Sequence, residues 1–165
     1  MATPPKGIPT ELLGLLDKIT PHIKAILSNK PNTQKLYEDT AAHPDRGEAT
    51  LQRIILQSGA QVTTATLIKN EVALIESTIR NKSPAKRAPY KVVERFDTIR
   101  LKAIAIVQLN QEAKRTIFPK IARAVVAQNL DMLDSLIEVL LEKSSIEGNL
   151  ALIIQQELEF LRRGE

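Results

Sequence analysis

Ten Lys and Arg side chains between residues 84 and 123 form the group in this sequence whose chemistry is easiest to assign. The segment holds three Asp or Glu residues, so its formal charge is +7, whereas the rest of the chain has 13 cations against 16 anions. Clustered cations focus an electric field that scattered cations do not, so we expect a polyanionic partner. The ten residues are Lys86, Arg87, Lys91, Arg95, Arg100, Lys102, Lys114, Arg115, Lys120 and Arg123.

These cations are suited to binding phosphates without reading a base sequence. Lys and Arg contact phosphate oxygens and position a duplex, whereas sequence is read at the base edges, and no recognition motif occurs here. Three Phe, two Tyr and no Trp leave few platforms for stacking unpaired bases, which disfavours single-stranded nucleic acid. The alternative is that the charge run is a solvated helical face beside a linker.

Patterns typical of catalysis or metal binding do not occur in the sequence. There is no Cys, and His22 and His43 have no carboxylate or second His at metal-ligand spacing. Glu157 and Glu159, two residues apart, would point to different sides of a helix, so they are not a paired acid and base. Six scattered Gly build no phosphate loop. We therefore expect a protein that is not an enzyme and has no metal and no cofactor.

Helices must position the cations, because apolar residues recur at three- and four-residue spacings and no strand alternation is sustained. We predict an all-α fold, a helical bundle of five to seven helices with an extended Pro-rich N-terminal arm at residues 1–9. Residues 10–165 would form a single helical domain. A basic, Pro-containing linker at residues 83–89 would join helices over 62–81 and 90–118, which would pair antiparallel.

Local helix breakers divide the predicted helices further. Interruptions are predicted at Pro21, residues 29–31, His43-Pro44, Ser58-Gly59, Phe118-Pro119, Asn129 and residues 144–149. Within the helix predicted over 90–118, Lys91, Arg95 and Lys102 fall in one narrow stripe. Four acids, Asp131, Asp134, Glu138 and Glu142, form a stripe that could lie against a basic stripe in this chain or in a neighbour.

The arm at residues 2–9, the linker at residues 84–89 and the helices beside it resemble in type the major capsid proteins of filamentous viruses of hyperthermophilic archaea. Those capsid proteins are small helical proteins without Cys, and their paired subunits wrap double-stranded DNA held in A form. The resemblance implies a capsid or nucleocapsid subunit that packages double-stranded DNA rather than RNA. It also implies self-association, or a related second subunit, and residence in the virion. The resemblance assigns no role to any residue, so the prediction that the ten cations bind phosphates depends on charge clustering alone.

A second hypothesis of a different class is a helical adaptor without any nucleic-acid role. In that case the acidic helix predicted over 130–142 and the last helix would meet a protein partner, and the protein would reside in the cytoplasm. No apolar run has the length of a membrane span or a signal peptide, so we expect no membrane insertion. We also expect no small-molecule substrate.

Overall fold

A computed structural model of the chain describes residues 10–43, 45, 47–80 and 90–163. Nearly every residue in these ranges is helical and no strand forms among them, which confirms the predicted all-α helical bundle. No helix of these ranges is long and apolar enough to cross a membrane. The predicted arm at residues 1–9 and linker at residues 83–89 lie outside the described residues.

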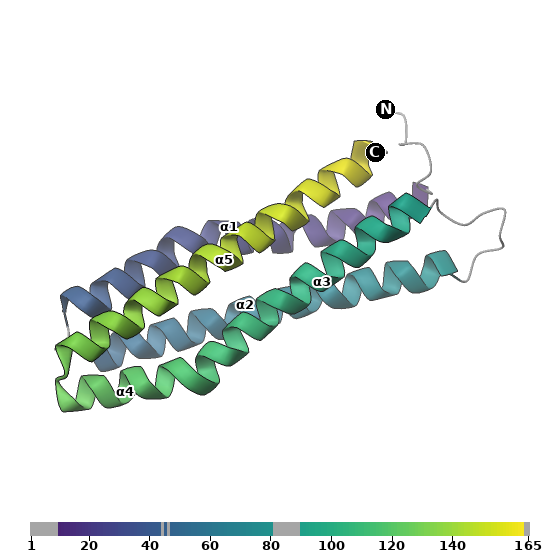
Figure 1. Ribbon diagram of the computed structural model, residues 1–165. Helices are drawn as coiled ribbons and strands as arrows, with labels where there is room; N and C mark the ends of the chain where they lie inside the picture. The colour runs from purple at the N-terminus through teal and green to yellow at the C-terminus, as the bar shows by residue number, and fades with distance from the viewer. Residues whose placement is uncertain (1–9, 44, 46, 81–89, 164–165) are drawn as a thin grey trace.

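Four rods make up the bundle. The elements in chain order are α1 (Thr10–Ala42), α2 (Gly47–Arg80), α3 (Tyr90–Glu112), the π-helix η3 (Ala113–Ile117), α4 (Phe118–Ala127) and α5 (Leu130–Arg163). The elements α3, η3 and α4 follow one another without a break and bend at η3 (Figure 1). We call this third rod the α3–α4 wall.

Each rod packs against two neighbours, in the cyclic order α1, α2, α3–α4 wall and α5. Arg162 Nη2 lies 2.8 Å from Asp17 Oδ1, which joins the end of α5 to the start of α1. Arg95 Nη1 lies 2.9 Å from Glu157 Oε2, which joins the start of α3 to the end of α5. Consecutive rods therefore run in opposite directions, as in an up-down-up-down four-helix bundle (Figure 1).

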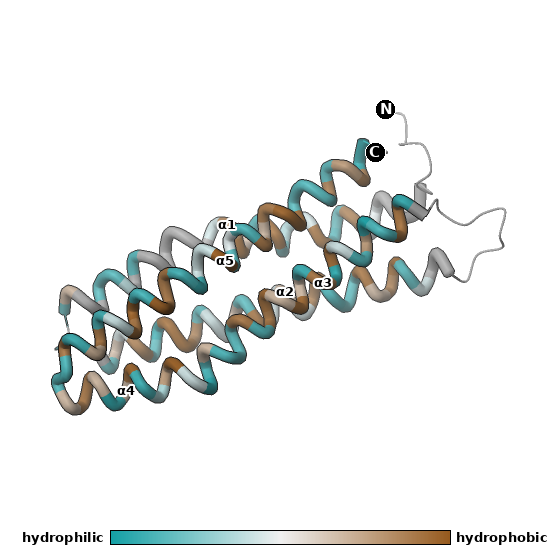
Figure 2. The backbone as a smooth tube through the Cα atoms, in the orientation of Figure 1, coloured by the Kyte–Doolittle hydropathy of each residue, from teal (hydrophilic) through white to brown (hydrophobic). Residues whose placement is uncertain are grey.

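Buried residues recur at alternating spacings of three and four along the rods, which is the repeat that coiled-coil packing uses. In α2 this buried row comprises Leu51, Ile54, Ser58, Gln61, Ala65, Ile68, Val72 and Ile75. Figure 2 shows apolar segments returning at short intervals along the tubes. The repeat explains why each rod stays helical over its whole length.

The predicted interruptions at Pro21, residues 29–31, Ser58-Gly59 and residues 144–149 are wrong, because α1, α2 and α5 continue through them. An interior Gly costs about 1 kcal/mol and an interior Pro about 3 kcal/mol relative to Ala. Each fully buried aliphatic side chain contributes about 1.5–3 kcal/mol, and several on each rod are buried, so burial of an unbroken row outweighs these breakers.

The predicted interruption at Asn129 is confirmed, since α4 ends at Ala127 and α5 begins at Leu130. Gln128 has a φ of 53°, in the left-handed region that often ends a helix. Asn129 Oδ1 accepts a hydrogen bond of 3.1 Å from the backbone N–H of Met132. Asn129 therefore caps α5 at its first turn.

A polar layer divides the interior into two apolar clusters. On the α3–α4 wall the first cluster ends at Ile106 and the second begins at Ala113, with buried Asn110 between them. The other rods show the same division at the same level. The polar layer consists of Ser58 and Gln61 from α2, Asn110 from α3 and Glu147 from α5. Ser58 Oγ donates a hydrogen bond of 2.8 Å to Asn110 Oδ1, which ties α2 to α3 inside the bundle.

Candidate nucleic-acid interface

The α3–α4 wall carries eight of the ten predicted cations, and Lys86 and Arg87 lie outside the described residues. Four cations lie on α3, at Lys91, Arg95, Arg100 and Lys102, and four on η3 and α4, at Lys114, Arg115, Lys120 and Arg123. The two sets of cations differ in their contacts. Two cations of the α3 set are held by acids of neighbouring rods.

Arg95 is part of the packing between α3 and α5. Its guanidinium makes the 2.9 Å ion pair with Glu157 and also lies over the ring of Phe160, 4.4 Å from the ring centroid. The two paired side chains are 17% and 18% exposed, so water screens the pair only in part. Arg95 therefore joins two rods and presents little charge to an external phosphate.

Arg100 is held by acids from its own helix and from α2. Its Nη2 donates a hydrogen bond of 3.1 Å to Asp97 Oδ1, and its Nε lies 3.5 Å from Glu76 Oε1. The hydrogen bond to Asp97 is the largest cause of a raised pKa for Arg100, while burial acts in the opposite direction. The Glu76 side chain is 8% exposed and would lose its cation if Arg100 turned outward.

Lys91 and Lys102 complete the α3 set. Lys91 is exposed and Lys102 is half-buried, and neither makes an ion pair with any residue of the described ranges. The predicted stripe of Lys91, Arg95 and Lys102 is therefore not continuous, because Arg95 pairs with Glu157 of α5.

The π-helix η3 decides where the second set of cations points. The backbone N–H of Phe118 bonds to the carbonyl of Ala113, five residues earlier, so this turn holds one residue more than an α-helical turn. The extra residue lets Ala113, Ile117 and Phe118 all face the core. Lys114 and Arg115 are left exposed between the buried positions. The predicted restart at Phe118-Pro119 is thus a widened turn and not a break.

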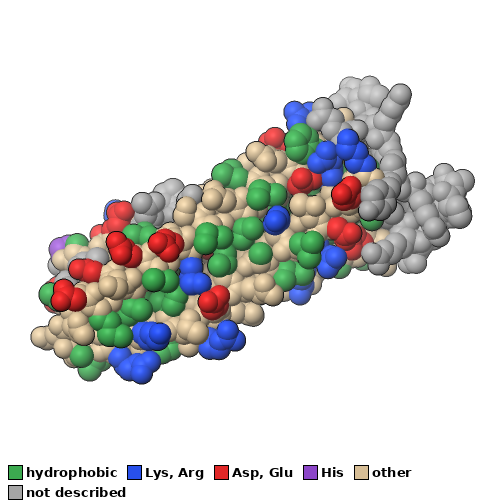
Figure 3. Space-filling model, in the orientation of Figure 1, with side chains coloured by type: hydrophobic (Ala, Val, Ile, Leu, Met, Phe, Trp, Pro, Cys, Tyr) green, Lys and Arg blue, Asp and Glu red, His purple; other side chains and the backbone are tan. Residues whose placement is uncertain are grey.

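A basic edge runs along η3 and α4. We use this name for Lys114, Arg115, Lys120 and Arg123, all of which are exposed. None of the four makes an ion pair within the described part of the chain, and Arg123 Nε donates a long hydrogen bond of 3.4 Å to the Pro119 carbonyl. Figure 3 shows Lys and Arg side chains gathered along the outer edge of the bundle at its α4 end.

A shallow groove follows part of the basic edge. It has a volume of about 380 Å³, lies between α4 and the start of α5, and is lined by Lys120, Arg123, Ala124, Ala127, Asn129 and Met132. Two cations beside small and polar groups suit an extended anionic backbone better than a compact ligand.

The acids at this end of the bundle lie apart from the basic edge. Asp131, Asp134, Glu138 and Glu142 are exposed on α5, and no ion pair joins them to the basic edge among the described side chains. Asp134 and Glu138 line a second groove, of about 620 Å³, together with Glu38 of α1. The predicted match between an acidic and a basic stripe is therefore not made inside the described bundle.

Comparison with protein families, with curated proteins and with solved structures finds no match to this chain.

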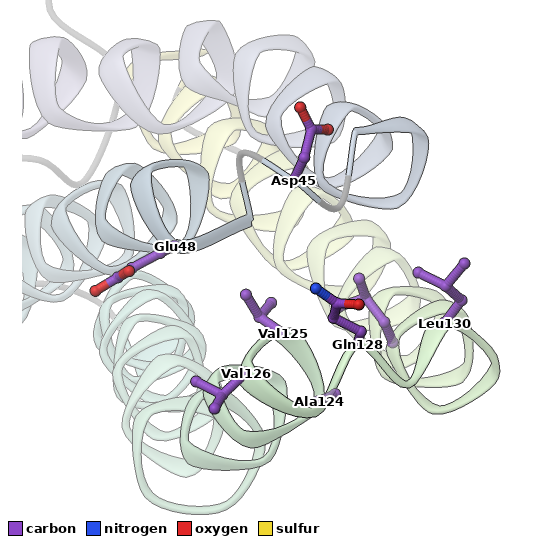
Figure 4. A pocket seen from close by; sticks show the side chains of 8 residues that line it. Asp45, Glu48, Ala124, Val125, Val126, Gln128 and Leu130 are labelled. Atoms are coloured by element: carbon purple, nitrogen blue, oxygen red, sulfur yellow. The ribbon is translucent and has the colours of Figure 1, made fainter.

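A hollow of about 530 Å³ lies at the same end of the bundle, between the α1–α2 connection, α4 and α5. In Figure 4 the carboxylates of Asp45 and Glu48 point away from each other and away from Val125 and Gln128. No three His, Cys, Asp or Glu residues of the described ranges lie close enough together to hold a metal ion. Among the described residues that line the hollow, no acid, base and nucleophile lie together where they could act on one substrate.

The polar layer holds a feature that the sequence analysis did not predict. Burial raises the pKa of Glu147 to about 7, against a smaller lowering by a hydrogen bond with Asn110. Burial and the charge of Glu147 also raise the pKa of Tyr37 on α1. Gln61 Oε1 and Glu147 Oε1 are buried and have no hydrogen-bond partner. Glu147 lines none of the three hollows described above, and we expect its protonation to affect the stability of the bundle.

Proposed function

We propose that this chain is a structural protein that binds the phosphates of a nucleic-acid duplex through its basic edge. The observation that carries the proposal is the set of four exposed cations, Lys114, Arg115, Lys120 and Arg123, which make no described ion pair. Lys91 and Lys102 are secondary contributors from α3. Arg95 and Arg100 are assigned to the fold, because their acids come from α5, α2 and α3.

The burial of the aromatic side chains favours a duplex over single-stranded nucleic acid as the ligand. Phe96, Phe118 and Tyr37 are at most 7% exposed, and Phe160 lies against Arg95. Bases that leave a duplex need an exposed aromatic face on which to stack, and these side chains offer none. The contacts available to the basic edge are contacts to the sugar-phosphate backbone, which carry no sequence information.

Packaging is the form of this activity that the resemblance to filamentous-virus capsid proteins favours. A coat subunit must bind many positions along a genome with equal strength, and a row of cations on a rigid helix meets that need. In this proposal the duplex is DNA and the protein resides in the virion. Lys86 and Arg87 remain predicted contacts outside the described residues.

The proposal predicts a salt-dependent affinity that depends on the basic edge. We expect K114A/K120A/R123A to bind a random-sequence DNA duplex about 10²-fold more weakly than the unmodified protein at about 0.1 M salt. The slope of log affinity against log salt should fall by about 3, one for each lost phosphate contact. Fluorescence anisotropy of a labelled duplex measures both quantities.

The matched control is K18A/K24A/K35A, which removes three exposed cations of α1 and changes the net charge by the same amount. We expect this variant to keep nearly all of the affinity, because α1 does not contribute to the basic edge. Equal losses in the two variants would mean that net charge alone drives binding. An affinity that does not change with salt in the unmodified protein would refute the proposal.

A further inference from the structure

Helix α2 carries a second row of residues at alternating spacings of three and four, on the side facing away from the core. This outer row comprises Ala49, Arg53, Leu56, Ala60, Thr63, Leu67, Asn70 and Leu74, and every member is exposed. Its repeat matches that of the buried row on the same helix, shifted by two residues. Such a row is the pattern by which one helix packs against another along its length.

The outer row is apolar enough to pack against another protein surface. Leu56, Leu67 and Leu74 are 73%, 43% and 53% exposed, and no charged residue occurs from position 54 to position 68. Thr63 Oγ1 donates to the carbonyl of Gly59 at 3.1 Å, so its hydroxyl is satisfied within the helix. By contrast, the first part of the outer face of α5 carries an exposed acid on each turn from Asp131 to Glu142.

The order of residues in the outer row is self-complementary when read in the opposite direction. An axis placed between Ala60 and Thr63 puts Leu56 opposite Leu67 of a second copy, and Ala60 opposite Thr63 of that copy. The same axis puts Leu74 opposite Ala49, so a large side chain meets a small one at each end of the row. A twofold axis generates this kind of reciprocal pairing.

The single charge of the row also fits this arrangement. Arg53 would lie opposite Asn70 of the second copy, whose side-chain oxygen accepts hydrogen bonds, and next to Glu71 of that copy. At the centre, Ala60 and Thr63 are small, and Gly59 beside them has open space within 4 Å of its missing side chain. Two α2 helices can therefore approach closely around the axis.

The geometry points to a twofold pair of this chain in which the outer rows of two α2 helices pack antiparallel. The occupant of the outer row is thus a second copy. The pairing is separate from nucleic-acid binding, because the basic edge lies on η3 and α4 and contributes no residue to the outer row.

The test compares L67E with L152E in protein freed of nucleic acid. Leu67 on α2 and Leu152 on α5 are 43% and 44% exposed, so the same substitution is made at two sites of equal exposure. We expect the unmodified protein and L152E to sediment at twice the mass of the chain. In L67E one carboxylate would enter each of the two symmetry-related contacts between Leu56 and Leu67, so the dimer dissociation constant should rise by about 10²-fold or more.

Cysteine substitutions test whether the two α2 helices pack antiparallel and which of their residues lie opposite each other. The chain has no Cys, so L56C and L67C each introduce a single thiol. We expect an oxidised mixture of the two variants to form a disulfide dimer between them, whereas each variant alone should not, since residues 56 and 67 are about 16 Å apart along a helix. Disulfide dimers of either variant alone would indicate parallel pairing and overturn the antiparallel assignment.

The remaining outcomes separate this inference from the proposed function. A monomeric unmodified protein, or an L67E variant that pairs as well as L152E does, would overturn the pairing, whether or not DNA binds. A partner of another sequence on a monomeric chain would also overturn it. The K114A/K120A/R123A variant should still sediment as a dimer, so loss of duplex binding leaves the pairing intact.

Discussion

The two halves of the α3–α4 wall carry four cations each, but these cations make different contacts. In the α3 half, Arg95 and Arg100 pair with acids that include residues of α5 and α2. In the η3 and α4 half, the four cations of the basic edge are exposed and make no described ion pair. Asn110 of the polar layer lies between the halves. Charge density along a sequence therefore does not distinguish cations that join helices from cations that face solvent.

The largest expected effect on stability comes from Glu147 of α5, in the polar layer that lies level with the boundary between the halves. Its pKa is raised from 4.5 to about 7 in the folded protein, so the folded state binds the proton more tightly than the unfolded state. This contribution is complete below pH 4.5 and is lost as the pH rises through about 7. We expect the free energy of unfolding to fall by about 3 kcal/mol across this window.

The control for this prediction is E147Q, which keeps a neutral side chain of nearly the same shape. Urea unfolding between pH 5 and 8 should show the decline in the unmodified protein and a much smaller change in E147Q. A parallel decline in both proteins would assign the pH dependence to other groups.

The next largest effect is expected in the α3 half. R95A removes the ion pair with Glu157, the contact with the Phe160 ring and the packing of the Arg stem. We expect a loss of about 2 kcal/mol in the free energy of unfolding, with duplex affinity nearly unchanged. R95K should recover only part of the loss, because an ammonium cannot reproduce the planar contacts of a guanidinium. A tenfold loss of duplex affinity in a folded R95A protein would place Arg95 in the interface after all.

The smallest effect on stability is expected in the basic edge. K120A/R123A removes two exposed side chains, so the free energy of unfolding should change by less than about 0.5 kcal/mol. Thermal unfolding followed by circular dichroism measures this change. A large destabilisation would mean that these cations, like Arg95, hold the bundle together, and the difference between the two halves would disappear.

The fold class follows from the sequence because the apolar spacing is helical along nearly the whole chain. The breaks at Pro21, Ser58-Gly59 and residues 144–149 were predicted wrongly, because each rests on a local preference of a few residues. The buried rows that override them are tertiary, and their free energy depends on neighbouring rods that a local window does not include. Asn129 does interrupt the chain, where the turn and the cap both favour a break.

The candidate site was predictable as a group of cations but not as a surface. Arg95 meets Glu157, which is 62 residues away, and no spacing in the sequence indicates that pairing. The extra residue in η3 is equally hidden, although buried Ile117 and Phe118 are adjacent, which a regular alternation of three and four does not allow. The outer row of α2 was not predicted from the sequence, although the 15 residues at positions 54–68, which include its centre, carry no charge.

The surplus residue in η3 has a consequence for how such a bundle can evolve. Because the wider turn absorbs one extra residue, deleting that residue would restore a regular helix and leave the helix downstream facing nearly the same way. The side chains of Lys120 and Arg123 would then stay beside the same neighbours. A one-codon insertion or deletion can thus be accommodated at this position, whereas a residue added elsewhere in a regular α-helical rod would turn everything downstream by about 100°.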